Sequence, residues 1–142
     1  MDSGLSCKFC QIASRAVATA IVFEDPLSLA FLDHRPLFPG HTLLVPKQHF
    51  ETLEKLPADL IDPFFRNVQL LSRALERGLK AEGSFVAINN RVSQSVPHLH
   101  VHIVPRRRKD GLRGFFWPRQ QYQDDAAMQQ AQAAIQRALR DA

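Results

Sequence analysis

PHLHVHIVP, residues 97–105, alternates histidines with aliphatic side chains. Successive side chains of a β-strand point to opposite faces of the sheet. The stretch therefore predicts a strand with imidazoles on one face and aliphatic groups on the other. The imidazoles belong to His98, His100 and His102, which are half of the six histidines in the chain. We expect the aliphatic face to pack on a core and the histidine face to form the active site.

Size and composition indicate one domain over residues 1–142, long enough to bury a core. A hydrophobic fraction of 45% and a charged fraction of 23% are ordinary for a globular protein. No apolar run approaches the roughly 20 residues of a membrane span, and the N-terminus lacks a signal-peptide pattern. We therefore expect a cytoplasmic protein. In that reducing compartment Cys7 and Cys10 are free thiols or metal ligands and not a disulfide.

The remaining patterns predict an α+β fold with an antiparallel sheet of about five strands. Expected strands cover residues 19–24, 28–33, 41–45, 84–89 and 99–104. A long helix carries an apolar stripe of Val68, Leu71, Leu75 and Leu79. We expect this helix to start near Asp62 or Pro63, after a separate turn at 51–56, and to stop at Gly78 or Gly83.

A final helix is expected to begin after Asp124 or Asp125, which can cap its first turn. Its apolar face consists of Met128, Ala131, Ile135, Ala138 and Leu139.

Three interpretations of the histidine face compete. A neutral imidazole has a pKa near ~6.5 and is nucleophilic at neutral pH. Neighbours at i±2 lie roughly 6.5–7 Å apart, close enough to flank one phosphate-sized centre. Two such histidines can also share a metal ion, and the third interpretation is a purely structural polar cluster.

Polar neighbours favour catalysis at a phosphate. Gln94 and Ser95 lie just before the histidines, and Asn89 and Asn90 end the preceding strand. Such uncharged donors suit anionic oxygens and leaving groups, whereas a pure metal site has no need of them. A basic cluster at 106–109, in a chain of net charge +4, also favours anionic partners.

The sequence resembles the histidine-triad (HIT) family over roughly residues 5–107. The run from His98 to Val104 matches the family signature of three histidines separated by hydrophobic residues, and Gln94-Ser95-Val96 extends it upstream. A second matching pattern runs from Phe31-Leu32-Asp33 through Pro39-Gly40-His41 to Pro46-Lys47 and His49. One departure is Ser93, where many members carry glycine. The C-terminal basic and aromatic loop and helix, 108–142, lie beyond this core.

The resemblance implies the HIT fold and a hydrolase or transferase acting at the α-phosphorus of nucleoside phosphoesters and phosphoramidates. His100 would attack that phosphorus and form a nucleotidyl-histidine, which water would then hydrolyse. His102 would contact the phosphate oxygens, and His98 would orient His100 through its backbone carbonyl. Ser95 matches the residue that serves the leaving group in Hint-type members.

The resemblance also implies a purine nucleotide as substrate. Gln94 and Asn89 match phosphate-binding positions, and Asp33 matches the carboxylate that holds the ribose hydroxyls. The base pocket would be lined by Val22, Phe23, Phe31 and His34. For the two phenylalanines, core packing is an equal alternative.

Cys7-Lys8-Phe9-Cys10 supplies half of a four-ligand zinc site. Many microbial HIT proteins resemble this arrangement and add a histidine after the Pro-Lys element and the first histidine of the triad. By that resemblance the ligands of a structural zinc are Cys7, Cys10, His49 and His98. Reduced thiols without a metal are the alternative.

Gly111 to Arg119 combines glycines, a basic residue and three aromatic residues. It predicts either a loop beside the active site or a segment that docks on the core or on a partner subunit. HIT proteins are commonly homodimers that pair their sheets, so a homodimer is expected.

The leaving group stays open at this point. Phosphoramidates and aminoacyl-adenylates fit Ser95, whereas dinucleoside polyphosphates fit the cluster at 106–109. A slow nucleotide-binding regulatory protein is one alternative. A DNA-adenylate hydrolase is another, although no zinc-finger module follows the triad.

Overall fold

The computed structural model describes residues 6–113 and 119–141, which form two units that divide after Asp110. In order, the first contains α2 (Lys8–Ala13), β1 (Ile21–Glu24), β2 (Ser28–Leu32), β3 (Thr42–Pro46), η1 (Leu53–Lys55), α3 (Ala58–Gly78), β4 (Gly83–Ala87) and β5 (Val101–Arg106). The second contains α4 (Asp125–Arg140). No helix in these described ranges has the length and apolar character needed to cross a bilayer.

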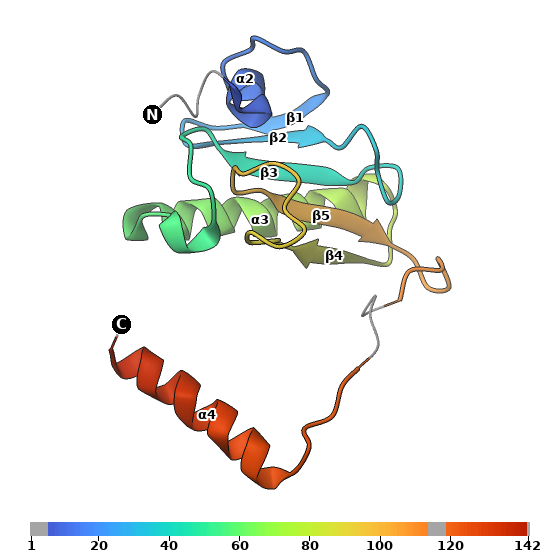
Figure 1. Ribbon diagram of the computed structural model, residues 1–142. Coiled ribbons are helices and arrows are strands. Elements are labelled where there is room, and N and C mark those ends of the chain that lie inside the picture. Colours follow the sequence, from blue (N-terminus) through green and yellow to red (C-terminus); the bar gives the residue numbers. More distant parts are fainter. Residues whose placement is uncertain (1–5, 114–118, 142) are drawn as a thin grey trace. The chain divides into compact units, whose positions relative to one another are not determined.

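The strands form one antiparallel sheet in the order β1-β2-β3-β5-β4 (Figure 1). All five predicted strands are present, with ends shifted by up to two residues. This confirms the expected α+β architecture. The sheet brings β5, from late in the chain, between β3 and β4, so the histidine segment lies centrally and not at an edge.

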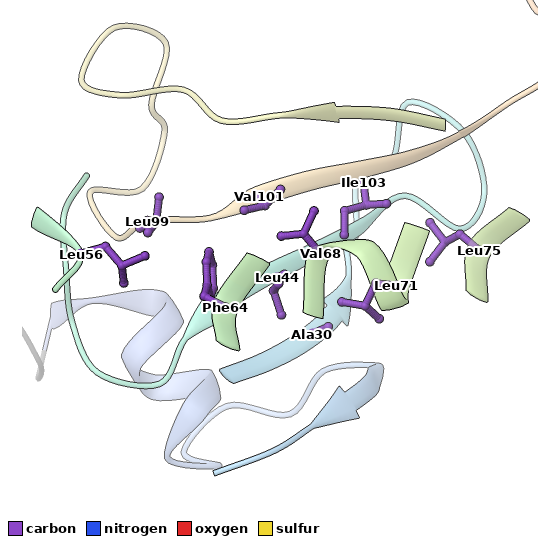
Figure 2. Packing of buried hydrophobic residues seen from close by; sticks show 10 residues of the cluster. All are labelled: Ala30, Leu44, Leu56, Phe64, Val68, Leu71, Leu75, Leu99, Val101 and Ile103. Carbon is purple, nitrogen blue, oxygen red and sulfur yellow. The ribbon is translucent and has the colours of Figure 1, made fainter. Parts of the chain in front are cut away.

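Two apolar clusters cover the two faces of the sheet. Alternate residues of β2 and β3 supply both, because neighbouring strand side chains point to opposite faces. Figure 2 shows the α3-side cluster, which consists of Ala30, Leu44, Leu56, Phe64, Val68, Leu71, Leu75, Leu99, Val101 and Ile103. On the opposite side α2 packs in a cluster of Cys7, Phe9, Ile12, Leu29, Phe31, Leu43 and Val45.

The long helix starts earlier than predicted. It begins at Ala58 after Pro57, and Pro63 lies inside it. The expectation that Asp62 caps the helix is wrong, since Asp62 pairs on the helix surface with Arg66, four residues later. The predicted turn at 51–56 is present as η1, and the predicted stop at Gly78 is confirmed.

Helix α2 was not predicted. It is only six residues long, and its N-cap is Cys7, whose sulfur accepts from the Cys10 amide at 3.5 Å. The sequence shows only Cys-x-x-Cys here, which is too short for a helical periodicity to be recognised.

In the second unit α4 has the predicted cap. The Asp124 carboxylate accepts from the Ala127 amide at 2.8 Å. None of its described side chains is buried, and Ile135 and Leu139 are 62% and 71% exposed. The predicted apolar face of α4 is therefore exposed and does not pack on other described residues of its own unit.

The connection from β2 to β3 holds Asp33, one of the predicted site residues, and turns on Gly40. The Asp33 amide donates to the His41 carbonyl at 2.9 Å, which closes the loop. Gly40 has φ +98°, and a Cβ there would lie 2.2 Å from Cδ1 of Leu79. The positive φ favours glycine at this position, and any larger residue would also displace the Leu79 side chain.

We expect Gly40→Ala to lower the free energy of unfolding by about 1–3 kcal/mol, because alanine is strained at this φ and displaces Leu79. Urea denaturation measures the loss. Gly83→Ala is the matched control, since a Cβ at Gly83 meets nothing within 4 Å. Equal losses in the two variants would contradict the prediction.

Candidate active site

The three histidines keep the predicted alternation, but the regular strand begins only at Val101. The residues before Val101 are not paired with β3. There the Leu99 amide donates instead to the Phe50 carbonyl, at 2.6 Å. Leu99 nevertheless packs in the α3-side cluster. The imidazoles of His100 and His102 lie together, with ring centroids 5.0 Å apart.

Backbone carbonyls assign the protons of two histidines, because a carbonyl oxygen can only accept. His100 Nδ1 lies 2.8 Å from the His98 carbonyl, so Nδ1 carries the proton and Nε2 carries the lone pair. His98 Nε2 lies 2.8 Å from the Pro46 carbonyl, which leaves the lone pair on Nδ1. Burial lowers the pKa of both, to about 4 for His98, and keeps both rings neutral.

The lone pair of His98 faces the two cysteines. Its Nδ1 lies 3.4 Å from Cys7 Sγ and 3.5 Å from Cys10 Sγ, and Cys10 Sγ lies 3.3 Å from His49 Nδ1. All four ligand atoms lie within 4.8 Å of one another. A tetrahedral Zn²⁺ with ordinary bond lengths puts sulfur and nitrogen ligands about 3.5 Å apart.

The donor set also has the chemistry of a zinc site. Burial raises the pKa of the Cys10 thiol to about 11, and Cys7 beside it adds to this rise. A divalent cation bound by both sulfurs would favour the thiolates instead. The bond from His98 Nε2–H to the Pro46 carbonyl is the outer contact that usually orients a ligating imidazole. The predicted ligands therefore fit zinc.

A hollow of about 350 Å³ lies beside the triad. It brings together six of the predicted site residues: Phe31, Asp33, His34, Ser95, His100 and His102. Asp33 Oδ1 accepts from the Arg35 amide at 2.9 Å, and this bond fixes the carboxylate at the wall of the hollow. Two imidazoles, a carboxylate and a hydroxyl thus share one cavity.

Four predicted substrate residues lie elsewhere. Val22 is 49% exposed, and Phe23 packs on the α3-side cluster. The register of β1 shifts between Ile21 and Phe23, which turns Phe23 toward the face opposite the hollow. The structure does not place these two in a base pocket.

The predicted phosphate-binding residues also lie outside the lining of the hollow. Asn89 is exposed. Gln94 donates to the Glu51 carbonyl at 2.6 Å and accepts from the Arg91 amide at 2.9 Å. In this structure Gln94 therefore holds the loop that precedes the triad, and its role toward phosphate stays a prediction.

Sequence reasoning missed the contribution of α2 to the site. Lys8, Phe9 and Ile12 line the hollow. The Phe9 ring contacts His100 edge to face, with centroids 5.0 Å apart and planes at 81°. The available signal was the i, i+3 spacing of Phe9 and Ile12, which puts both on one face of a helix.

Ser93, the departure from the family pattern, has an unfavourable backbone conformation. Ser93 has φ +60°, a left-handed conformation that favours glycine. We expect Ser93→Gly to raise the free energy of unfolding by about 1 kcal/mol, as measured by urea denaturation. Ser14→Gly is the control, because φ of Ser14 is −85° and glycine gains nothing there. An unchanged or lower stability of Ser93→Gly would count against this reasoning.

Comparison with known proteins agrees with this geometry. The family model of the HIT domain matches residues 14–109 of the sequence. The chain belongs to the HIT family. A HIT-like protein of Methanocaldococcus jannaschii is 40% identical over 107 residues, covering 74% of this chain and 82% of that protein.

Solved HIT structures share the fold. A HIT protein from Bacillus subtilis superposes with a TM-score of 0.83 at 32% identity, covering 93% of this chain and 96% of that one. A zinc-bound HIT protein from Mycobacterium smegmatis gives 0.73 at 34% identity, with 92% and 99% covered.

Two related HIT proteins carry the names of hydrolases. The adenylylsulfatase HINT3 of Arabidopsis thaliana is 33% identical, over 75% of this chain and 55% of that protein. The asymmetrical bis(5'-nucleosyl)-tetraphosphatase of Schizosaccharomyces pombe is 35% identical, over 66% of this chain and 53% of that protein. The family thus includes nucleotide hydrolases.

Proposed function

We propose that this HIT protein hydrolyses purine nucleoside phosphoramidates or adenylates at the α-phosphorus through a nucleotidyl-His100 intermediate. The observation that carries the proposal is the 2.8 Å contact of His100 Nδ1 with the His98 carbonyl. This contact leaves the lone pair of a neutral imidazole on Nε2, and His100 lines the hollow. A neutral imidazole needs no base to remove a proton before it attacks.

The reaction would take two displacements. His100 Nε2 forms a bond to phosphorus while the bond from phosphorus to the leaving group breaks. The leaving atom is an amine nitrogen, which takes up a proton, or the oxygen of an acyl or sulfate group. Water then attacks phosphorus and releases the nucleoside monophosphate and the free imidazole. Ser95, at the rim of the same hollow, is the hydroxyl available to the leaving group.

Binding of the nucleoside follows from the lining of the hollow. Asp33 is the acceptor for the ribose hydroxyls, and Phe31 and Phe9 supply aromatic surface for the base. His34 lines the same cavity.

A polyphosphate leaving group has less support, because the three arginines of the basic cluster bind other groups of the fold. Arg106 binds Asp110 at 2.7 Å, Arg107 donates to the Leu79 carbonyl at 2.6 Å, and Arg108 pairs with Glu82 at 3.2 Å. These arginines do not belong to the lining of the hollow. We therefore rank phosphoramidates and adenylates above dinucleoside polyphosphates.

Product analysis with adenosine 5′-phosphoramidate, adenylylsulfate, diadenosine tetraphosphate and adenylated DNA tests the proposal. We expect AMP from the first two, with kcat/KM at least about tenfold above the tetraphosphate. A preference for the tetraphosphate or for adenylated DNA would reverse the ranking. Nucleotide binding without any product would indicate a regulatory binding protein.

We also propose that Cys7, Cys10, His49 and His98 hold a structural zinc ion. Four protein ligands close the coordination sphere, so the ion would join α2 to the segment that follows β3 and to the triad, and it would not contact the reacting phosphorus.

A homodimer that pairs two sheets remains a further proposal. Strand β4 lies at an edge of the sheet, and edge strands can pair with a strand of a second copy. Light scattering should give about twice the chain mass of 16.1 kDa. A monomeric mass at all concentrations would contradict pairing. The cytoplasmic location and the role of residues 111–119, of which 114–118 lie outside the described chain, stay predictions.

A further inference from the structure

A second hollow, of about 360 Å³, adjoins the one beside the triad. Lys8, Ser95 and Val96 line both hollows, so these residues form the boundary between them. Cys7 and His49, two of the proposed zinc ligands, line only the second hollow, which therefore lies against the proposed zinc site. The mechanism proposed above assigns no role to this second space.

The direction of the proposed reaction gives the second hollow a place in it. In phosphoryl transfer the attacking atom and the leaving atom lie roughly in line, on opposite sides of phosphorus. His100 lines only the first hollow, whereas Ser95, the hydroxyl proposed for the leaving group, lines both. A leaving group that contacts Ser95 therefore extends from the phosphorus into the second hollow.

Lys8 supplies a positive charge at the boundary. It is the first residue of α2, its side chain is exposed, and its ammonium has no ion-pair partner within the described parts of the chain. In this it differs from the arginines at 106–108, which bind other groups of the fold. An ammonium offers three donors and no acceptor, so it suits a carboxylate.

Glu51 determines which charge fits farther from the phosphorus. It lines the second hollow but not the first, so it lies beyond the boundary that Lys8 shares. A negative group deep in the second hollow would meet the like charge of Glu51, and like charges in contact lower affinity. An anionic leaving group therefore fits when its charge lies close to the bond that breaks.

We propose that Lys8 is a specificity-determining residue that selects leaving groups with a carboxylate next to the scissile bond. An amino acid joined to phosphorus through its α-nitrogen has this arrangement. The inference rests on the proposed function: His100 Nε2 forms its bond to phosphorus, the P–N bond breaks, and the nitrogen takes up a proton. The free amino acid then leaves with its carboxylate beside Lys8.

Two substrates that differ in one charge test the selection. They are the adenosine 5′-phosphoramidates of glycine and of glycinamide, which share the P–N bond and are similar in size. We expect the ratio of their kcat/KM values, glycine over glycinamide, to be at least about fivefold higher in the wild-type protein than in Lys8→Gln. In Lys8→Glu the ratio should be lower still. An equal ratio in the wild-type protein and Lys8→Gln overturns the inference.

Three further variants are the controls. Lys8→Arg keeps the charge and should keep most of the wild-type ratio. Lys80→Gln removes an exposed lysine that lines neither hollow, and it should leave the ratio unchanged. Glu51→Gln removes the opposite charge and should not lower the ratio. If the ratio falls as far in Lys80→Gln as in Lys8→Gln, only the net charge of the protein matters, and the role of Lys8 is rejected.

Equilibrium binding separates this inference from the proposed hydrolysis. In His100→Ala the glycine compound should bind more tightly than the glycinamide compound, and adding Lys8→Gln should remove the difference. If this preference is found but the wild-type protein releases no AMP, the role of Lys8 stands and the proposed hydrolysis fails. If AMP is released from both compounds in a ratio that does not depend on Lys8, the hydrolysis stands and the role of Lys8 is rejected.

Discussion

Replacing His100 with alanine is expected to lower kcat for nucleoside phosphoramidates by about 10³-fold or more. The variant loses the nitrogen that is proposed to form the bond to phosphorus. No other described side chain in the lining of the hollow occupies its place. Nucleotide binding should survive, because Asp33 and Phe31 stay in place. Steady-state kinetics and equilibrium binding of AMP separate the two effects.

The covalent intermediate gives a direct readout of the same prediction. Intact-protein mass spectrometry after rapid quenching without acid should detect an adduct with the mass of one nucleoside monophosphate on the wild-type protein. The adduct should be missing from His100→Ala. In His100→Gly, added imidazole should restore turnover because it can occupy the space of the lost ring. Full activity of His100→Ala would reject His100 as the nucleophile.

Removing the cysteine ligands should have the largest effect on stability. Cys7→Ser combined with Cys10→Ser is expected to abolish stoichiometric zinc and to lower the free energy of unfolding by on the order of 3 kcal/mol or more. The ion would join α2 to His49 and His98, which lie 39 and 88 residues away from Cys10 in the sequence. Elemental analysis and urea denaturation measure the two losses.

Loss of zinc should also disturb the position of His100, the proposed nucleophile. Phe9 lies between the two cysteines, and its ring packs on both His98 and His100. We therefore expect the double variant to lose activity together with stability. Ser14→Ala, at the end of the same helix, should keep one zinc per chain. Unchanged zinc content in the cysteine variant would reject the proposed site.

Much of the fold could be predicted because it depends on local patterns. The alternation of Leu99, Val101 and Ile103 with histidines assigns one face to the core and the other to the site, and the structure keeps both faces. The stripe from Val68 to Leu75 likewise predicts the helix that covers the sheet. Both periodicities follow from backbone geometry and need no tertiary information.

Other features depend on neighbours that a local pattern cannot contain. Asp62 reads as a cap, but the helix already begins at Ala58. Phe23 reads as a pocket residue, but an irregular register in β1 turns it to the other face. Helix α2 has too few residues to show a period, yet its Phe9 contacts His100.

By itself the sequence determined the α+β class, the five strands and the histidine face, and its motifs carried the resemblance to the HIT family. Only the tertiary structure decided which nitrogen of His98 carries a proton, since that depends on the carbonyl of Pro46. Residue types give an imidazole two equivalent choices, and a hydrogen-bond partner supplied by folding selects one of them.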